Sequence, residues 1–476
     1  MTDPTGHRAS AADIAAAVRA GDVTAVAVAE AALTRIAGEN QRLNAFTDVT
    51  AERALAEAAA TDRKRAEGAD PGPLAGVPYA VKSLFDIAGL PTRAGALINR
   101  DRAPAAADAT LIRRMTAAGA TLTGALNMGE YAYDFTGENL HEGDCRNPHD
   151  TGCMPGGSSS GSGAATAGGL VPVTLGSDTN GSLRVPASLC GVFSLKPTYS
   201  RLSRAGTFAF VDSLDHVGPM ARSARDLALA YDAMQGPDKA DHACAARPAD
   251  PALPGLDQTG GRLRIGVPRG WCAASSGERA ERALQTALDG LRENGAAPRE
   301  VDLDAAEYGR AAAFLISNAE SGQFHLDRLR ERPQDFDPDT RDRFFAGALL
   351  PAAWVVRAQR VRAWWLRAVL TTFGEVDALV VPATPMSAPR LGTRTIDLHG
   401  REVPLRPNLG ILAQPFSCVG LPVVTVPVFP PGEMPIGVQI VAPPWREARA
   451  LRIAHQLEQA GVACAHPPEA AARAAQ

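Results

Sequence analysis

Two spacings of apolar residues alternate along the chain. One is the three- to four-residue repeat of helices, and the other is the short β-branched run that is typical of buried strands. The helical repeat predicts helices over residues 11–20, 24–36, 50–68, 105–118, 164–169, 224–234, 279–291, 341–373 and 445–460. The apolar runs predict strands over residues 77–81, 121–126, 171–176, 263–267, 299–303, 377–381, 423–428 and 436–441. This alternation is typical of an α/β fold.

Composition excludes several classes of partner. The net charge of −4 and the pI near 6.2 show none of the basic excess of a nucleic-acid-binding protein. No apolar run reaches the length of a membrane span, and the first residues lack the pattern of a signal peptide. The seven cysteines are scattered and form no C-x-x-C pair. We therefore expect a cytoplasmic protein with no nucleic-acid or membrane partner.

The glycine- and serine-rich stretch 155–203 stands out from this pattern. Such a run is also typical of a flexible linker, but here a strand, a turn and a helix follow at once. Residues 157–161 fit the G-x-S-x-G nucleophile elbow, although the strand that an elbow needs does not precede them. Ser182 lies at the tip of the turn 178–182. A serine in this position, beside backbone N–H groups, suits a nucleophile next to an oxyanion hole.

Lys82 is the second unusual residue. The chain has 48 basic residues, of which only Lys64, Lys82, Lys196 and Lys239 are lysines, so the other 44 (48 − 4) are arginines. Lys82 ends a predicted buried strand and has apolar neighbours on both sides. Its side chain could simply extend to the surface, but a buried lysine, unlike arginine, can lose its proton. We favour a functional role for Lys82.

These residues suffice for a serine–lysine hydrolase. The nine histidines are dispersed and indicate no Ser-His-Asp triad, and no metal or phosphate-binding motif is present. In this hypothesis Ser182 attacks a carbonyl, and a serine between Ser158 and Ser162 passes its proton to a neutral Lys82. Backbone N–H groups at Thr179, Asn180 and Gly181 would stabilise the oxyanion.

Residues 156–186 resemble the core motif of the amidase signature family, G-G-S-S-[GS]-G-S…G-S-D-T-x-G-S-[IL]-R-x-P. The resemblance extends over nearly the whole chain. Its further segments are VKSLFDIAGLPT (81–92), VVPATP (380–385), and GLPVVTVP followed by PIGVQIV (420–441).

The resemblance implies a role for each candidate residue. Ser182 falls on the nucleophile, Lys82 on the general base, and Ser158 on a bridging serine carried by a cis peptide bond. The family's oxyanion hole falls on the N–H groups of residues 179 to 182. The positions of supporting side chains fall on Ser159, Asp178 and Arg184. The family uses an acyl-enzyme and requires neither metal nor cofactor.

The resemblance also implies a fold: one large α/β domain in which helices cover both faces of a mixed, twisted β-sheet. We accordingly interpret 1–476 as a single domain. It comprises an N-terminal helical region (1–70), a catalytic core (74–225) and the remainder of the fold (262–462). Residues 248–261, with three prolines and three glycines, are a linker or insertion.

Three positions depart from the family pattern. Asn180, Ser194 and Ser200 stand where glycine is usual. Asparagine tolerates a positive φ better than most residues, so we expect the turn to be kept with Asn180 in that conformation. A second expectation is that the Asn180 side chain faces the pocket and narrows the range of substrates.

Within the family, residues 177–193, 203–219 and 226–238 look most like the branch of 1-carboxybiuret hydrolases. That branch cleaves small urea-like C–N bonds, and its members allow for a small helical accessory subunit. An aryl amide or carbamate hydrolase is the alternative within the family. Two other classes are a glutamine-hydrolysing subunit of a tRNA-dependent amidotransferase and a non-catalytic scaffold.

The pocket walls are less well defined by the sequence. The loop 127–143 and the region 318–345 are the candidates. The pocket residues predicted from these loops and from the glycine-rich stretch are Tyr131, Tyr133, Phe135, Gly156 and Gly157. The tryptophan- and arginine-rich segment 354–367 further suggests a homodimer.

Overall fold

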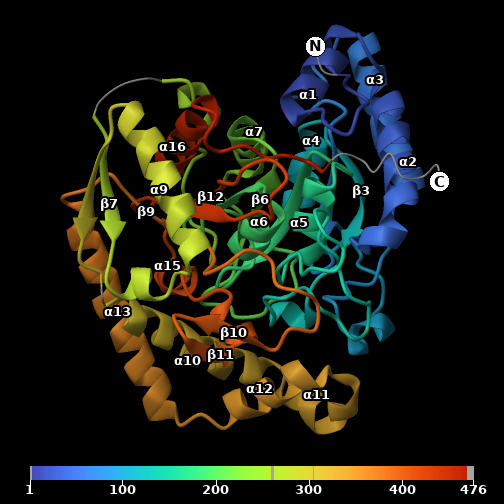
Figure 1. Cartoon of the computed structure of the whole chain (residues 1–476). Helices are drawn as coiled ribbons and strands as arrows, with labels where there is room; N and C mark the ends of the chain where they lie inside the picture. The colour runs from blue at the N-terminus through green and yellow to red at the C-terminus, as the bar shows by residue number, and fades with distance from the viewer. Residues whose placement is uncertain (1–2, 259–261, 304, 469–476) are drawn as a thin grey trace.

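The computed structural model describes residues 3–258, 262–303 and 305–468, which are built around an eleven-stranded mixed sheet (Figure 1). From edge to edge its strands are β1 (Phe46–Val49), β3 (Thr121–Leu126), β2 (Pro78–Lys82), β4 (Val173–Asp178), β6 (His216–Ala221), β5 (Phe193–Lys196), β12 (Val423–Pro427), β13 (Gly437–Val441), β9 (Ala378–Pro382), β7 (Arg264–Pro268) and β8 (Ala297–Val301). Strand β2 runs parallel to β3 and β4, and β7 runs parallel to β8 and β9. The other neighbouring strands are antiparallel, which confirms the mixed sheet.

Helices bury both faces of this sheet. On β2, Tyr79 and Val81 enter the main hydrophobic core, whereas Ala80 between them packs with Ala164 and Ala165 in a separate cluster. Alternate residues of a strand point to opposite faces, so the two cores lie on the two sides of the sheet. The main core includes side chains of α7 (Ala224–Met234), α9 (Glu278–Glu293) and α16 (Glu447–Gln459). The other side is covered by α5 (Ser160–Ala167) and α6 (Arg184–Cys190).

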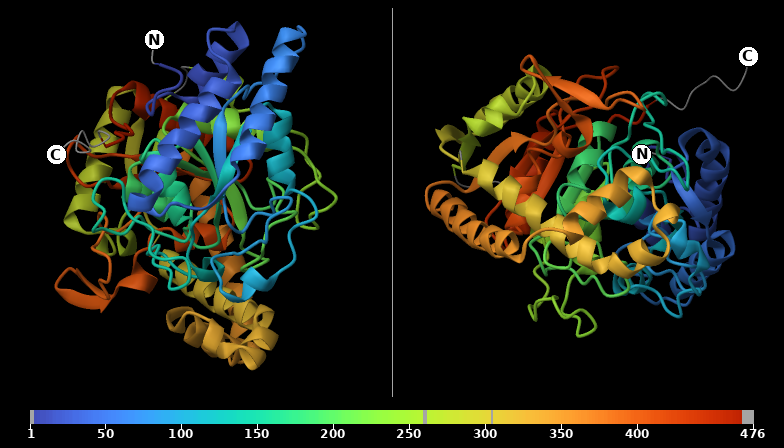
Figure 2. Two further views of the ribbon diagram at one scale, coloured as in Figure 1. Left: turned by 90° about the vertical axis from the view of Figure 1, so that its right-hand side faces the viewer. Right: turned by 90° about the horizontal axis from the view of Figure 1, so that it is seen from below.

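Two helical groups flank the sheet. The N-terminal group is α1 (Ala11–Ala20), α2 (Ala25–Leu43) and α3 (Ala51–Ala66), beside the β1–β3 edge, with α4 (Thr110–Ala117) nearby (Figure 1). The second group is α10 (Ala306–Phe324), α11 (Leu326–Glu331), α12 (Pro338–Ala348) and α13 (Ala352–Phe373), which lies at one end of the strands (Figure 2). Smaller elements are the helices α8 (Trp271–Ala274), α14 (Leu405–Asn408) and α15 (Gln414–Cys418) and the hairpin β10 (Thr395–Leu398)–β11 (Arg401–Pro404).

Several predicted elements need correction. The helix expected over 341–373 is two helices, α12 and α13, because Pro351 caps the second. Helix α10 and strand β5 were not predicted, and the segment 208–218 expected to be irregular runs into β6.

The described part of the proline- and glycine-rich segment, residues 248–258, packs partly against the main hydrophobic core. Ala252 and Leu256 are buried in the main core on either side of a short 3₁₀ turn, Leu253–Gly255. Residues 259–261 of this segment lie outside the described residues. Across the described part of the chain, no helix combines the length and the apolar character needed to cross a membrane.

Candidate active site

Lys82 and Ser158 meet at the carboxyl end of two parallel strands. Lys82 is the last residue of β2 and Ser177 lies near the end of β4, so the β2–β4 register brings both to one edge. Lys82 Nζ donates hydrogen bonds to Ser158 Oγ at 2.6 Å and to Ser177 Oγ at 2.9 Å. The lysine and Ser158 are fully buried, and the Gly157–Ser158 peptide bond is cis. The contact with Ser177, which the sequence analysis did not foresee, involves the residue just before Asp178.

Burial changes the charge state of this lysine. Removal from water lowers the pKa of Lys82 to about 7, because the charged form is poorly solvated in the interior. The carboxylates of Asp215 and Asp178 act in the opposite direction and hold the pKa from falling further. A large share of Lys82 is therefore neutral near pH 7 and able to accept a proton from Ser158.

Ser159 ties the serine-rich loop to β4. Its hydroxyl donates to the Ser177 carbonyl at 3.1 Å and accepts from the Ser177 N–H at 3.2 Å. Gly156 has φ 81°, and a Cβ there would lie 2.9 Å from Pro186 Cα in α6. The loop thus passes close to both β4 and α6, and this packing sets the position of Ser158.

Ser182 lies on the turn between β4 and α6, four residues after Asp178. Gly181 has φ 142°, and a Cβ there would approach Ala413 Cβ to 2.9 Å. Asn180 is not among the residues with positive φ, so the expectation that it takes that conformation is wrong, and Gly181 makes the bend instead. Of the three unusual positions, only Ser200 has a positive φ, of 67°.

The backbone N–H groups of this turn take no part in the hydrogen bonds of the sheet or of α6. Among the described residues, no hydrogen-bond acceptor is found for the backbone N–H of Asn180, Gly181 or Ser182. Thr179 is held instead by its side chain, whose hydroxyl donates to the partly buried Asp215 at 2.6 Å. Free donors beside a serine are the arrangement that binds an oxyanion.

A buried ion pair fixes the two ends of the turn. Arg184 Nε and Nη2 donate to the Asp178 carboxylate at 2.9 and 3.0 Å, and neither side chain is exposed. Burial alone would raise the pKa of Asp178, but the charge and hydrogen bonds of Arg184 outweigh it and hold that pKa well below its usual value. Asp178 also accepts the Leu183 N–H at 3.1 Å. The predicted supporting residues Asp178 and Arg184 thus brace the turn that carries Ser182.

A narrow pocket opens at Ser182. Its walls come from the turn, from the loop after β3, and from α10 and α12; they include Tyr133, Phe135, Asn180, Phe314, Ser317, Asn318 and Arg343. Its free volume of about 20 Å³ holds little more than a water molecule.

The predicted pocket residues divide into two groups. Tyr133 and Phe135 line the pocket, whereas Tyr131, Gly156 and Gly157 are not among its lining residues. The Tyr131 ring packs against His325, with centroids 4.2 Å apart, so it belongs to a neighbouring aromatic cluster. The walls that were not predicted from the sequence include Phe314 and Ser317 of α10, together with Phe210 and Gln414.

Arg343 lines this pocket and forms no ion pair with a carboxylate of the described residues. The Arg343 guanidinium lies 3.6 Å from the centroid of the Tyr133 ring and donates to the Tyr133 carbonyl at 2.9 Å. No salt bridge joins Arg343 to any of the described residues. The Tyr133 hydroxyl in turn donates to the Asn318 side chain and narrows the pocket. An unpaired guanidinium in such a pocket suits an anionic group on a small molecule.

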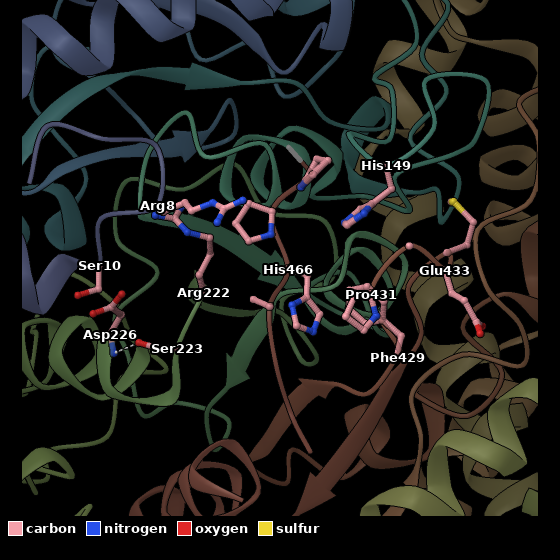
Figure 3. A pocket seen from close by; sticks show the side chains of 15 residues that line it. Arg8, Ser10, His149, Arg222, Ser223, Asp226, Phe429, Pro431, Glu433 and His466 are labelled. Carbon is pink, nitrogen blue, oxygen red and sulfur yellow. Dashed lines mark hydrogen bonds between the residues drawn. The ribbon is translucent and has the colours of Figure 1, made fainter. Parts of the chain in front are cut away.

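A larger cavity lies elsewhere. It has a volume of about 720 Å³ and is lined by Arg8, His149, Arg222 and His466 among others (Figure 3). It shares no lining residue with the Ser182 pocket. Size alone would therefore misplace the candidate site. Over residues 3–258, 262–303 and 305–468, no cluster of three or more histidine, cysteine or acidic residues is arranged to hold a metal ion.

Known proteins share this architecture over nearly its full length. The amidase family model matches residues 27–451. AtzE of Pseudomonas sp. (strain ADP), which is a 1-carboxybiuret hydrolase subunit, is 53% identical over 454 residues, 95% of this chain and 98% of that protein. A glutamyl-tRNA(Gln) amidotransferase subunit of Azotobacter vinelandii is 37% identical over 480 residues, 95% of this chain and 98% of that protein.

Solved structures agree with these matches. One, described as a vestigial protein complex that reveals the evolutionary origins of an s-triazine catabolic enzyme, has a TM-score of 0.94 and 52% identity, covering 96% of this chain and 100% of its own. An amidase structure has a TM-score of 0.85 and 32% identity, with 94% and 99% coverage. Fold and sequence together define a hydrolase of carbon–nitrogen bonds other than peptide bonds. The chain belongs to the amidase signature family.

Proposed function

We propose that this protein hydrolyses a small urea derivative, best represented by 1-carboxybiuret, through Ser182, Ser158 and Lys82. The observation that carries the proposal is the 2.6 Å contact of Ser158 with a buried lysine whose pKa is about 7. The 53% identity to a 1-carboxybiuret hydrolase subunit supports the choice of substrate.

The proposed reaction uses one relay twice. Ser182 Oγ bonds to the carbonyl carbon while its proton passes to Ser158, and the Ser158 proton passes to Lys82 Nζ. The N–H groups of the 179–182 turn stabilise the oxyanion. When the C–N bond breaks, the proton returns from Lys82 through Ser158 to the departing nitrogen. Water then attacks the acyl carbon and gives a proton to the same relay, which returns it to Ser182 Oγ as the bond between that oxygen and the acyl carbon breaks. No step requires a metal ion.

The pocket favours a small anionic substrate over an aryl amide or an aryl carbamate. Its volume of about 20 Å³ means that any substrate needs side-chain movement to enter, and an aromatic ring needs more movement than a small urea. The unpaired Arg343 offers a carboxylate a charge-assisted hydrogen bond, and 1-carboxybiuret carries a carboxylate. Glutamine also carries one, so the 37% identical amidotransferase subunit supports the second candidate, hydrolysis of glutamine.

Product release from a panel of compounds tests the function. The panel contains biuret-type ureas with and without a carboxylate, an aryl anilide, an aryl carbamate and glutamine. We expect turnover of the carboxylated urea, a loss of roughly 10⁴-fold or more in Ser182→Ala, and a loss of about tenfold or more in Arg343→Met. Ser162→Ala is the matched control, because Ser162 is a buried serine of α5 whose hydroxyl donates to the Leu175 carbonyl.

The other outcomes decide among the alternatives. Turnover of glutamine alone would favour the amidotransferase function, and turnover of the anilide or carbamate would reject the urea assignment. Turnover that survives Ser182→Ala would mean that Ser182 is not the nucleophile. Inhibition by a metal chelator would contradict a metal-independent reaction.

We further propose a cytoplasmic protein that forms a homodimer and that binds a small accessory subunit. All seven cysteines, each within the described residues, are free, which suits a reducing compartment. Trp354 and Trp364 on α13 are 56% and 45% exposed, which suits a protein interface. The similar structure described as a protein complex supports a partner subunit.

A further inference from the structure

The side-chain carboxamide of Asn180 uses its nitrogen but not its oxygen in hydrogen bonds with the described residues. Asn180 is only 9% exposed, lines the pocket, and lies two residues before Ser182 on the same turn. Its Nδ2 donates to Ser317 Oγ on α10 at 2.8 Å. Its Oδ1 is buried and has no hydrogen-bond partner among the described residues. A buried acceptor without a partner is unfavourable, so this pocket is prepared for a donor that the ligand brings.

The substituents of the attacked carbonyl determine which group of the substrate can donate a hydrogen bond to Asn180 Oδ1. With the carbonyl carbon over Ser182 and its oxygen toward the turn N–H groups, two substituents remain on that carbon. The departing nitrogen must receive its proton from the side of Ser158. The other substituent stays on the acyl-enzyme. Asn180 belongs to the turn that carries these N–H groups, and its side chain lines the pocket beside them.

This retained substituent separates ureas from amides. In an amide it is a carbon atom, which has no proton to donate to an oxygen acceptor. In a urea it is a second nitrogen bearing N–H. An amide would bury Asn180 Oδ1 without a partner, whereas a urea would satisfy it.

We propose that Asn180 Oδ1 accepts a hydrogen bond from the retained N–H of the substrate and thereby selects ureas over amides. The inference rests on the proposed hydrolysis of a urea derivative. Ser317 is a positioning residue, because its hydroxyl holds the other edge of the carboxamide. Ser317 is itself 1% exposed, so this orientation is fixed by packing.

A matched pair of substrates tests the proposal. Biuret and N-acetylurea can each lose urea, and in that cleavage the group retained on the attacked carbonyl is NH₂ in the first and CH₃ in the second. Only urea release is therefore counted, because loss of ammonia or acetamide reports attack with another retained group. The measured quantity is the ratio of kcat/KM for biuret to kcat/KM for acetylurea, followed by chromatography. In Asn180→Ala we expect this ratio to fall by about 5- to 150-fold, the effect of losing one hydrogen bond to a buried acceptor. Ser317→Ala should give a smaller fall in the same ratio.

Equal losses on both substrates in Asn180→Ala would overturn the proposal, because Asn180 would then act only through the turn. If the wild-type enzyme hydrolyses neither compound, the proposed function is called into question and binding decides the inference. Ligand-observed NMR titration should show tighter binding of biuret than of acetylurea to Ser182→Ala, and no preference in the Ser182→Ala/Asn180→Ala double variant. Equal affinities for Ser182→Ala would also overturn it.

Discussion

At the scale of single residues, Lys82 shows how burial alone prepares a base. Among the described residues, no carboxylate lies within hydrogen-bond reach of the lysine, and its two acceptors are the hydroxyls of Ser158 and Ser177. Hydroxyls replace part of the water shell of an ammonium group but do not neutralise its charge. The protonated form is therefore the unfavourable one, and the pKa falls to about 7.

This burial should be visible in protein stability. The unfolded chain binds a proton at Lys82 up to about pH 10.5, but the folded chain binds it only up to about pH 7. Burial of the lysine therefore costs stability at low pH, and the unfolding free energy increases as pH rises between these two values. Relative to Lys82→Met, we expect the wild type to gain roughly 2–5 kcal/mol in unfolding free energy as pH rises from 7 to 10. Urea unfolding at several pH values measures this, with exposed Lys64→Met as control. A difference that stays constant with pH would contradict it.

At the scale of elements, a buried ion pair joins the two ends of the turn between β4 and α6. Arg184→Met leaves Asp178 buried without its ion-pair partner, so the pKa of that carboxyl rises because burial is then opposed only by weaker contributions, among them that of Lys196. We expect a loss of about 3–5 kcal/mol in unfolding free energy, measured by urea titration. The matched variant Arg264→Met breaks an ion pair whose arginine is 50% exposed and should lose under about 1 kcal/mol. Equal losses would mean that the buried pair has no special weight.

The sequence predicts some of these elements closely and others poorly, for identifiable reasons. The predicted bounds agree with α1, α7 and β3. A serine caps the start of each of the two helices, and Gly119 separates β3 from the helix before it. Helix α10 lacks a clear apolar stripe because it packs against α12, α13 and α15 and also turns Ser317 and Asn318 to the pocket. Local pattern does not reveal such a helix, whose residues are fixed by tertiary contacts.

The candidate site divides in the same way. Lys82, Ser158 and Ser182 are recognisable from the motifs that surround them, and the structure brings the first two into contact. The contact of Ser177 with Lys82 depends on the register between β4 and β2. The orientation of the Asn180 carboxamide depends on where α10 places Ser317. Register and crossing of distant elements are not encoded in a short stretch of sequence.

At the scale of the whole molecule, the pocket joins segments far apart in the chain. The turn after β4 supplies Ser182, whereas the group of helices at the end of the strands supplies Ser317 and Arg343. Those helices also carry a large exposed apolar surface. Its members, here called the α10–α13 face, are Tyr308, Trp354, Val356, Trp364 and Leu370. Tyr308 of α10 and Trp364 of α13 make an edge contact, with ring centroids 6.0 Å apart, so exposed side chains of the two helices meet at this point.

We expect a second copy of the chain to cover this face. Exposed apolar side chains of this size stabilise an interface in the way that a core stabilises a fold, and monomers rarely leave them in water. The double variant Trp354→Glu/Trp364→Glu should sediment as a monomer in analytical ultracentrifugation, while the wild type sediments as a dimer. Leu140→Glu, at a side chain 67% exposed in the loop after β3, is the control and should remain dimeric.

A monomeric wild type would reject the homodimer, and a dimer that persists in the double variant would move the interface to another face. Because α10 also lines the pocket, the variants should be assayed for turnover in the same samples, which shows whether covering the face influences the site.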